Sequence, residues 1–304
     1  MGVKSPITNS ENCTLVKEID TSEIIEIYRT QFNIDISRFF TNHDKISQYK
    51  CLDTGFEFFF PLNLEGDENY YQKMGKLPWY YCDNRWEHQK AISIIKDGTS
   101  LLEVGSGSGF FLQQLKSNKK VDIVGLELNL DAISTAKKNG LVIIPEYIQD
   151  YSSNNKEKFD VVCSFQVLEH VSDPFSFLRS SVDCLKKNGV LIIGVPNNDS
   201  FIKNNIMDSR VLNLPPHHVG LWSESSLKSL EKYLPLKFEN TFFEPLVGGS
   251  VGPYLWNKLY ILFKSKFLLR VIWKLQIHFV LIAMLKPFRN KIKGSSMLMT
   301  FRKI

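Results

Sequence analysis

The sequence has few cysteines and no long apolar run, and both shortages narrow the class of protein. Its five cysteines are scattered and odd in number, which suits a reducing cytoplasm better than a disulfide framework. No stretch approaches the roughly 20 apolar residues of a membrane-spanning helix. Residues 1–20 are polar, so we expect no signal peptide. With 304 residues, 43% of them hydrophobic, the chain can bury one large core or two modest ones.

Acidic residues are absent from one long stretch near the C-terminus. Residues 251–293 contain nine lysines and arginines and neither aspartate nor glutamate, although the whole chain has a net charge of only +5. The remainder is therefore mildly acidic. A block of one charge sign marks a functional surface or a solvated face and does not determine a fold.

A missing glycine distinguishes the stretch LLEVGSGSGFF, residues 101–111, from a dinucleotide-binding fingerprint. That fingerprint, G-x-G-x-x-G, needs its third glycine at position 110, where this chain has Phe110. Glycines let a backbone turn tightly and approach a ligand, and the following helix points its N-terminal amides at that ligand. Here three glycines recur at every second position after an acid: Glu103, Gly105, Gly107 and Gly109. This spacing resembles motif I of class I S-adenosylmethionine-dependent methyltransferases.

From Thr99 onward, strand-like segments alternate with helix-like ones. Such alternation predicts an α/β fold with a parallel sheet covered on both faces. Strands are expected at 100–104, 121–127, 141–144, 159–164 and 189–195, and helices at 109–117, 130–139, 173–186 and 223–234. Segments 236–243 and 296–302 would complete a doubly wound, mostly parallel sheet of seven strands with an antiparallel last strand. A basic helical insertion, residues 245–294, would precede that strand.

The first 97 residues are expected to form a cap on a catalytic domain of residues 98–304. The cap would contain a helix near 22–29, a hairpin of strands 46–51 and 55–60, and two helices within 68–97. The hairpin resembles the Cys-x-x-Cys ribbon at the front of some sugar methyltransferases, but Thr54 replaces the second cysteine after Cys51. One thiolate cannot hold structural zinc, which needs four ligands, so we expect a metal-free hairpin.

Acidic residues follow two predicted strands at the edge where open α/β sheets bind ligands. Glu127 ends the second strand, where a carboxylate can accept both hydroxyls of an adenosine ribose. Asp150 follows the third strand, at the position expected near the adenine amino group. One acid at a strand end is more often a solvated or helix-capping residue. Two such acids that share the sheet edge with Glu103 and the glycine loop favour a cofactor site.

The fourth strand continues as FDVVCSFQVLEHVSDP, residues 159–174. This run closely resembles a block of the ubiquinone-biosynthesis O-methyltransferases and their small-molecule and sugar relatives, and the resemblance extends over residues 101–197. It implies methyl transfer, with S-adenosyl-L-methionine as cofactor and S-adenosyl-L-homocysteine as product. The cofactor-binding residues that it implies are Glu103, Gly105, Ser106, Gly107, Gly109, Glu127, Leu128, Asp150, Phe165 and Gln166.

Histidines on the acceptor side are the candidates for catalysis. His170 follows the fourth strand, and the alternative is that it only closes the pocket. His217 and His218 lie in a loop that resembles one in methyltransferases of bacterial surface-glycan gene neighbourhoods. A histidine of near-neutral pKa suits removal of a hydroxyl proton, so we select His218, ahead of His217, as the general base. The alternative is that both histidines only stiffen the loop and take no part in catalysis. Aromatic residues at 79–81 form either a lid or ordinary packing.

Part of the resembling family binds a divalent metal through a Glu-x-x-Glu-His run. In this chain the first position is Gln166, followed by Glu169 and His170. A neutral amide is a poorer ligand for a hard cation than a carboxylate. We therefore predict no metal site.

The predicted function is methyl transfer to an oxygen of a glycan or small molecule, free or lipid-linked. A quinone or lipid O-methyltransferase is one alternative. A nucleic-acid methyltransferase is another alternative, which the basic stretch alone supports. Residues 164–166 lack the Asp/Asn-Pro-Pro-aromatic run of amino-adenine enzymes, and no Pro-Cys nucleophile of cytosine enzymes is present. A cofactor-binding protein without turnover is a further alternative, since the glycine loop and Glu127 argue only for binding.

Residues 266–285 of the insertion are predicted to form one amphipathic helix, with Arg270, Lys274 and His278 along one face. Two charges near its middle argue against a membrane span. The helix would either lie in an anionic membrane interface or pack on the body or on a second subunit. If the helix lies in a membrane interface, we expect a cytoplasmic protein that is peripheral on the inner face of the membrane and near a lipid-linked acceptor. The number of subunits is left open.

Overall fold

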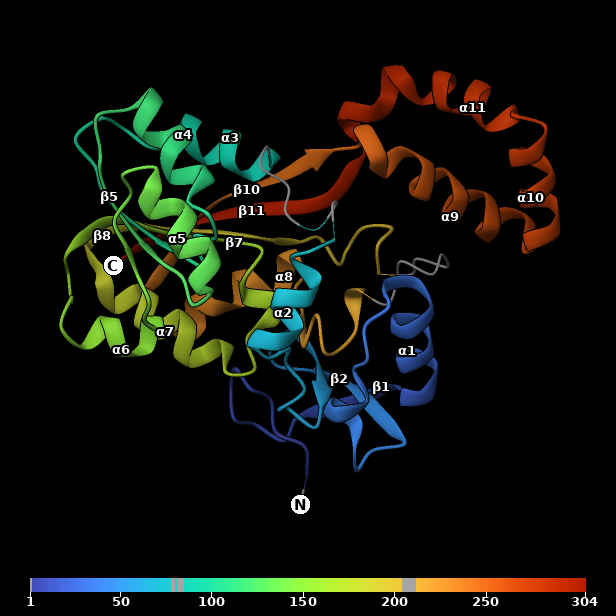
Figure 1. Cartoon of the computed structure of the whole chain (residues 1–304), viewed down its shortest axis with the longest axis horizontal. Coiled ribbons are helices and arrows are strands. Elements are labelled where there is room, and N and C mark those ends of the chain that lie inside the picture. The colour runs from blue at the N-terminus through green and yellow to red at the C-terminus, as the bar shows by residue number, and fades with distance from the viewer. Residues whose placement is uncertain (1, 78–79, 81–84, 204–211) are drawn as a thin grey trace.

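A seven-stranded sheet forms the centre of the chain (Figure 1), for which a computed structural model describes residues 2–77, 80, 85–203 and 212–304. Its strands are β4 (Ser100–Val104), β5 (Asp122–Leu126), β6 (Ile143–Ile144), β7 (Phe159–Phe165), β8 (Leu185–Pro196), β10 (Leu236–Pro245) and β11 (Lys293–Lys303). Their order is β10-β11-β8-β7-β4-β5-β6. Strands β4 to β8 pair in parallel, whereas β11 is antiparallel to both β8 and β10. The predicted α/β sheet with an antiparallel last strand is confirmed.

Helices cover both faces of this sheet because its strands bury alternate side chains on each side. On β7, for example, Val161 and Cys163 pack with one helical layer and Val162 packs with the other. The first layer contains α3 (Trp86–Ile94), α4 (Phe110–Asn118) and α5 (Leu130–Lys138). The second contains α6 (Ile148–Ser153), α7 (Pro174–Cys184) and α8 (Glu224–Lys228). Most of these helices match the predicted ranges, but α6 is not among the predictions and α8 is shorter.

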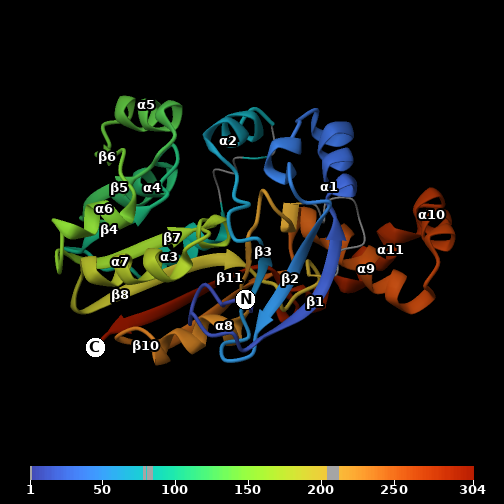
Figure 2. The same ribbon diagram turned by 90° about the horizontal axis from the view of Figure 1, so that it is seen from below.

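The N-terminal cap is built on a second, four-stranded antiparallel sheet, which lies beside the main one (Figure 2). The strands lie in the order β1-β2-β3-β9. Their bounds are Cys13–Asp20 for β1, Lys45–Cys51 for β2, Glu57–Phe60 for β3 and Gly220–Leu221 for β9. The cap also contains helices α1 (Thr21–Ile27) and α2 (Glu68–Met74). The predicted β2–β3 hairpin is present. Strand β9 comes from the loop after β8, where Gly220 pairs with Phe58 and Leu221 with Glu57. The cap therefore includes residues beyond the expected boundary at position 97. Trp79 and Tyr81 of the expected aromatic lid lie outside the described residues.

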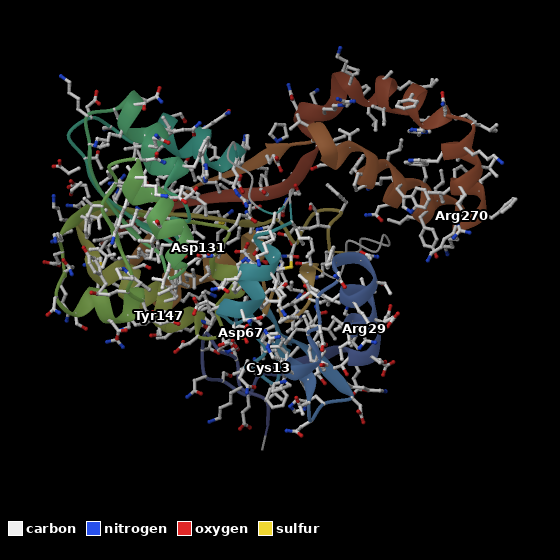
Figure 3. The ribbon with its side chains drawn as sticks, viewed as in Figure 1. Cys13, Arg29, Asp67, Asp131, Tyr147 and Arg270 are labelled. Atoms are coloured by element: carbon white, nitrogen blue, oxygen red, sulfur yellow. The ribbon has the colours of Figure 1, made fainter. Side chains whose placement is uncertain are left out.

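The predicted insertion consists of three helices that project from the β10–β11 edge of the sheet (Figure 1). They are α9 (Val251–Phe263), α10 (Lys266–Lys274) and α11 (Ile277–Leu285). Figure 3 places Arg270 on this projection, far from Asp131 on α5. We call residues 245–294 the basic insertion.

The prediction of one continuous helix over residues 266–285 is wrong. The chain breaks between α10 and α11, where Gln276 adopts a left-handed conformation with φ of 59°. Arg270 and Lys274 therefore do not share a helix face with His278. Among the helices of the described ranges, none is by itself long and apolar enough to cross a membrane. Only α10 together with Ile277–Lys291 meets that criterion, as a pair bent by 91°.

Candidate active site

The three glycines after β4 have different structural roles, although all three have positive φ angles. A Cβ at Gly105 would lie 2.4 Å from Val167 Cγ2, and one at Gly109 would lie 2.3 Å from Leu141 Cδ1. Close packing therefore requires these two glycines. A Cβ at Gly107, with φ of 52°, would meet nothing within 4 Å. The middle of the loop thus borders open space, which is where a bound cofactor would lie.

Glu127 connects the glycine loop to the end of β5. Its Oε2 accepts a hydrogen bond of 2.7 Å from the Gly107 amide, and its Oε1 accepts 2.8 Å bonds from the Leu128 and Asn129 amides. The sequence predicts that this carboxylate binds ribose hydroxyls. In the structure it binds the backbone beside the open space, so it holds the loop in shape. A carboxylate has about four lone-pair sites, so these bonds leave capacity for a hydroxyl donor.

Two buried polar atoms in and just before the glycine loop have no hydrogen-bond partner among the described residues. One is Oε2 of Glu103, whose residue is only 3% exposed, and the other is Oγ of Ser106. Burial, with the charge of Glu127 adding to it, raises the pKa of Glu103 well above its usual range. A buried acid without a partner fits a ligand that carries positive charge. S-adenosylmethionine has an ammonium and a sulfonium group, so the residues present fit this cofactor.

The other predicted cofactor residues lie at neighbouring strand ends. Leu128 exposes 43% of its surface just after β5, where an apolar side chain can cover a flat base. Asp150 is exposed in the first turn of α6, after β6. Phe165, at the end of β7, is buried, and its ring packs against Phe111 with centroids 4.8 Å apart.

Gln166 forms the corner between β7 and the segment that carries His170. It has a left-handed φ of 55°, and its amide donates to the Gly194 carbonyl across 2.8 Å. Its side-chain Nε2 donates to Oε1 of Glu87, also at 2.8 Å, and Glu87 is 3% exposed on α3. Glu87 lies 79 positions before its partner, so no local sequence pattern indicates this contact. The Gln166 side chain is thus engaged with α3.

The acceptor-side histidines converge although they come from two distant segments. Their ring centroids are 4.7 Å apart for His170–His217 and for His217–His218, and 4.9 Å apart for His170–His218. His170 lies in a 3-10 turn, Leu168–His170, and its Nδ1 donates to the His217 carbonyl oxygen. In the same stretch, the Val219 amide donates to the Glu169 carbonyl across 2.9 Å. We call His170, His217 and His218 the histidine cluster.

Burial dominates the electrostatics of the histidine cluster. It lowers the pKa of His170 to about 4 and the pKa values of His217 and His218 well below their usual range. The near-neutral pKa expected of the base is therefore absent, and all three rings are neutral at pH 7. Burial also raises the pKa of Glu169 to about 8. A neutral imidazole still has a lone pair that accepts a proton or binds a cation.

Two tyrosines of α2 complete this region. The Tyr70 hydroxyl lies 3.1 Å from His217 Nδ1 and 2.8 Å from the Tyr28 hydroxyl. The Tyr71 ring meets the His170 ring edge-on, with centroids 5.7 Å apart. Neither tyrosine is identified by the sequence analysis, since no local pattern links α2 to the loop around residue 217. The cap therefore forms one wall of the histidine cluster.

Comparisons with known proteins agree with this geometry. The family described as "Methyltransferase domain" matches residues 76–232. The "Ubiquinone biosynthesis O-methyltransferase" of Actinobacillus pleuropneumoniae serotype 5b is 32% identical over 119 residues, which cover 36% of this chain and 50% of that protein. The protein of that name from Histophilus somni is 33% identical over 107 residues, covering 32% and 44%. The chain thus spans about half the length of these relatives.

A solved structure with a similar fold is among the matches. It is the complex of the Haloferax volcanii Trm112 methyltransferase activator with a methyltransferase, with a TM-score of 0.50 and 15% identity. The match covers 72% of this chain and 89% of that one. At this identity the similarity concerns the fold alone.

Proposed function

Because this chain belongs to the methyltransferase domain family of class I S-adenosylmethionine-dependent enzymes, we propose that it methylates an oxygen of a glycan or small molecule. One observation carries the proposal: the cofactor loop and the histidine cluster are in direct continuity. Val167 lies against Gly105, and the next turn contains His170. Bound S-adenosylmethionine supplies a methyl group on a positively charged sulfur. The proposed chemistry therefore needs an acceptor held between that sulfur and the histidines.

The chain's own residues have separable tasks in this proposal. Glu127 fixes the glycine loop, and the buried carboxyl of Glu103 would ionise beside the positively charged cofactor and so balance its charge. His218 receives the acceptor's proton at Nε2, since its Nδ1 lies 2.9 Å from Oδ1 of Asn213, which can only accept. That bond holds the ring in the tautomer and orientation that the transfer needs.

The direct test is release of S-adenosylhomocysteine with two panels of acceptors. One panel contains cell-surface glycan precursors, and the other contains hydroxylated quinone precursors, which the names of the relatives favour. Turnover with either panel supports methyl transfer and identifies the acceptor class. Tight cofactor binding without turnover on any acceptor would instead support a cofactor-binding protein.

Removing the carboxylate of Glu127 tests the cofactor site. Glu127→Ala is expected to weaken S-adenosylhomocysteine binding by about 2–3 kcal/mol, because charge-assisted hydrogen bonds to the loop and to hydroxyls are lost. Calorimetry measures the change. Glu146→Ala, which removes an exposed acid near the end of β6, is the control and should bind normally. Equal affinities for the two variants would place the cofactor elsewhere.

We further propose that the basic insertion holds the protein at an anionic membrane surface, close to a lipid-linked acceptor. Its helices expose large apolar side chains instead of packing them on the body: Phe267 is 77% exposed and Leu262 is 70% exposed. On α10 only Leu269 is buried, and α11 buries none of its residues. Residues 251–293 contain nine cations and no acid, and each cation near anionic lipid adds about 1 kcal/mol. These features favour a membrane interface over packing on the body.

Liposome flotation tests the membrane proposal. The protein is expected to float with anionic liposomes, less with neutral ones, and to be released by high salt, because salt screens the cations. Phe267→Ser with Phe279→Ser should reduce flotation. The matched control is Leu15→Ser, which removes an exposed apolar side chain of β1. Equal recovery in the soluble fraction with both lipids at low salt would refute the membrane proposal and favour a second subunit as the partner.

A further inference from the structure

Two cysteines of the cap lie directly opposite each other on neighbouring strands. Cys13 begins β1 and Cys51 ends β2, and the antiparallel register pairs them although a long stretch of chain separates them. The backbone bond is made by the next pair, in which the Leu52 amide donates to the Asn12 carbonyl across 2.8 Å. The Cys51 amide donates instead to the Phe56 carbonyl, on the β3 side. The two cysteines are therefore a non-hydrogen-bonded pair, the position in an antiparallel sheet where opposite residues come closest.

This placement meets the geometric requirement of a disulfide bond. In non-hydrogen-bonded pairs the Cα atoms are about 4.5 Å apart, and disulfides bridge residues whose Cα atoms are about 4.4–6.8 Å apart. The side chains must also point the same way. Those of Cys13 and Cys51 do so, since the two thiols are within hydrogen-bonding contact of each other.

The two thiols have different surroundings. Cys51 is 0% exposed, and its sulfur lies 3.8 Å from the Thr8 hydroxyl. Burial raises the pKa of Cys51, but hydrogen bonds from Ser5, Thr54 and the backbone outweigh it and lower the pKa below its usual value. Cys13 is half-buried, and burial together with the neighbouring Cys51 raises its pKa to about 11. Cys13 is thus the more accessible thiol, and Cys51 ionises more readily.

We propose that Cys13 and Cys51 form a reversible oxidation site, in which a disulfide fastens β1 to β2. The oxidant is a small disulfide such as oxidised glutathione. The thiolate of Cys13 attacks one of its sulfurs, so a mixed disulfide forms and one glutathione thiol leaves. The thiolate of Cys51 then attacks the Cys13 sulfur, and the second glutathione leaves as the protein S–S bond forms. The protein loses two electrons and two protons, and the small disulfide gains them as two thiols.

This site gives a role to the cysteine that remains from the resembling Cys-x-x-Cys ribbon. The sequence predicts a metal-free hairpin because Thr54 leaves Cys51 as its single thiolate. The structure adds Cys13 from a distant part of the chain. Two thiolates are still fewer than the four ligands of structural zinc, but two are what a disulfide needs.

Oxidation would strengthen the strand of the cap that has the least side-chain packing. Strand β1 buries none of its side chains, so backbone pairing with β2 is what holds it. A disulfide closes residues 13–51 into a loop and lowers the entropy of the unfolded chain. Neither cysteine belongs to the glycine loop or to the histidine cluster, so this inference does not depend on the proposed function.

The test is incubation of the full chain in buffers of reduced and oxidised glutathione, followed by alkylation of the remaining thiols and peptide mapping by mass spectrometry. The expected product is a linked pair of peptides that contain Cys13 and Cys51, and dithiothreitol should separate them. The oxidised protein should have a Tm about 5 °C above that of the reduced protein. If the most oxidising buffer yields no such link, or links Cys13 to another cysteine, the proposal is wrong.

Single substitutions test the role of each thiol. Cys51→Ser should stop at the mixed disulfide, with one glutathione on Cys13, because no second thiol displaces it. Cys13→Ser changes a half-buried position and should leave the buried Cys51 unmodified. The control is Cys184→Ala, which removes a buried cysteine at the end of α7 and should form the link normally.

Thermal unfolding of Cys13→Ser keeps the inference testable if Cys51→Ser does not fold. Oxidising conditions should not change the Tm of this variant. An increase as large as that of the unsubstituted protein would show that the link is not its cause and would refute the proposal. Cofactor binding plays no part in these measurements, so their result stands whether or not the proposed function is correct.

Discussion

Replacing Gly107 by valine is expected to abolish binding of S-adenosylhomocysteine. The glycine has φ of 52°, and its missing Cβ points to open space beside the carboxylate of Glu127. A branched side chain would fill the volume that the cofactor needs and would also strain the backbone by about 1–3 kcal/mol. Calorimetry with the purified variant should detect no heat of binding, and thermal unfolding should show a protein that still folds.

A valine at a second glycine of positive φ distinguishes the effect of lost space from the effect of backbone strain. Gly248 has φ of 56°, and a Cβ there also meets nothing within 4 Å, but it lies at the start of the basic insertion. Gly248→Val should carry similar strain and bind the cofactor normally. If Gly107→Val binds with near-native affinity, the open space beside the loop does not hold the cofactor.

Removing the imidazole of His218 should lower turnover by about 10²–10⁴-fold, with cofactor affinity unchanged. The ring is oriented by Asn213 and lies 4.9 Å, centroid to centroid, from His170. In the proposed function it acts on the acceptor as a base, and alanine removes that role. Single-turnover rates at saturating cofactor measure the chemical step.

His43 is an exposed histidine of the cap and provides the comparison, since His43→Ala should turn over at the normal rate. A decrease of less than tenfold for His218→Ala would mean that the enzyme works by aligning its substrates. Retained affinity for S-adenosylhomocysteine in His218→Ala is required, because the histidine cluster lies beyond the glycine loop. If His218→Ala lost both turnover and affinity for S-adenosylhomocysteine, the substitution would have disrupted the structure of the whole site.

Features coded by short stretches of chain could be predicted from the sequence. The strands of the main sheet follow from runs of buried apolar residues, and the glycine loop follows from spacing within nine positions. Strand β1 carries no such signal, because its pattern CTLVKEID leaves nearly every side chain exposed. The helix break at Gln276 likewise has no signal in the sequence, because neither a glycine nor a proline stands there. Local periodicity identifies elements that bury one face and misses those held mainly by backbone pairing.

The histidine cluster depends on contacts between distant positions. His170 and His217 are 47 residues apart, and Tyr70 and His217 are 147 apart. Their sequence positions place all three on the acceptor side but do not predict that their rings touch. That contact depends on bonds between the two segments, such as the Val219 amide donating to the Glu169 carbonyl. Long-range pairing of this kind leaves no trace in composition or spacing.

The pairing of β3 with β9 also connects the loop of His217 and His218 to the N-terminal cap. The loop bearing His217 and His218 continues directly into Gly220, which is hydrogen-bonded as a neighbour of Phe58. The same loop is bonded to the main domain, because the Val219 amide donates to the Glu169 carbonyl and His170 Nδ1 donates to the His217 carbonyl. The histidines thus lie at a seam where the cap and the methyltransferase sheet are held by one short segment of chain. A chain starting at Thr99 would keep its glycine loop but lose the wall that holds the histidines.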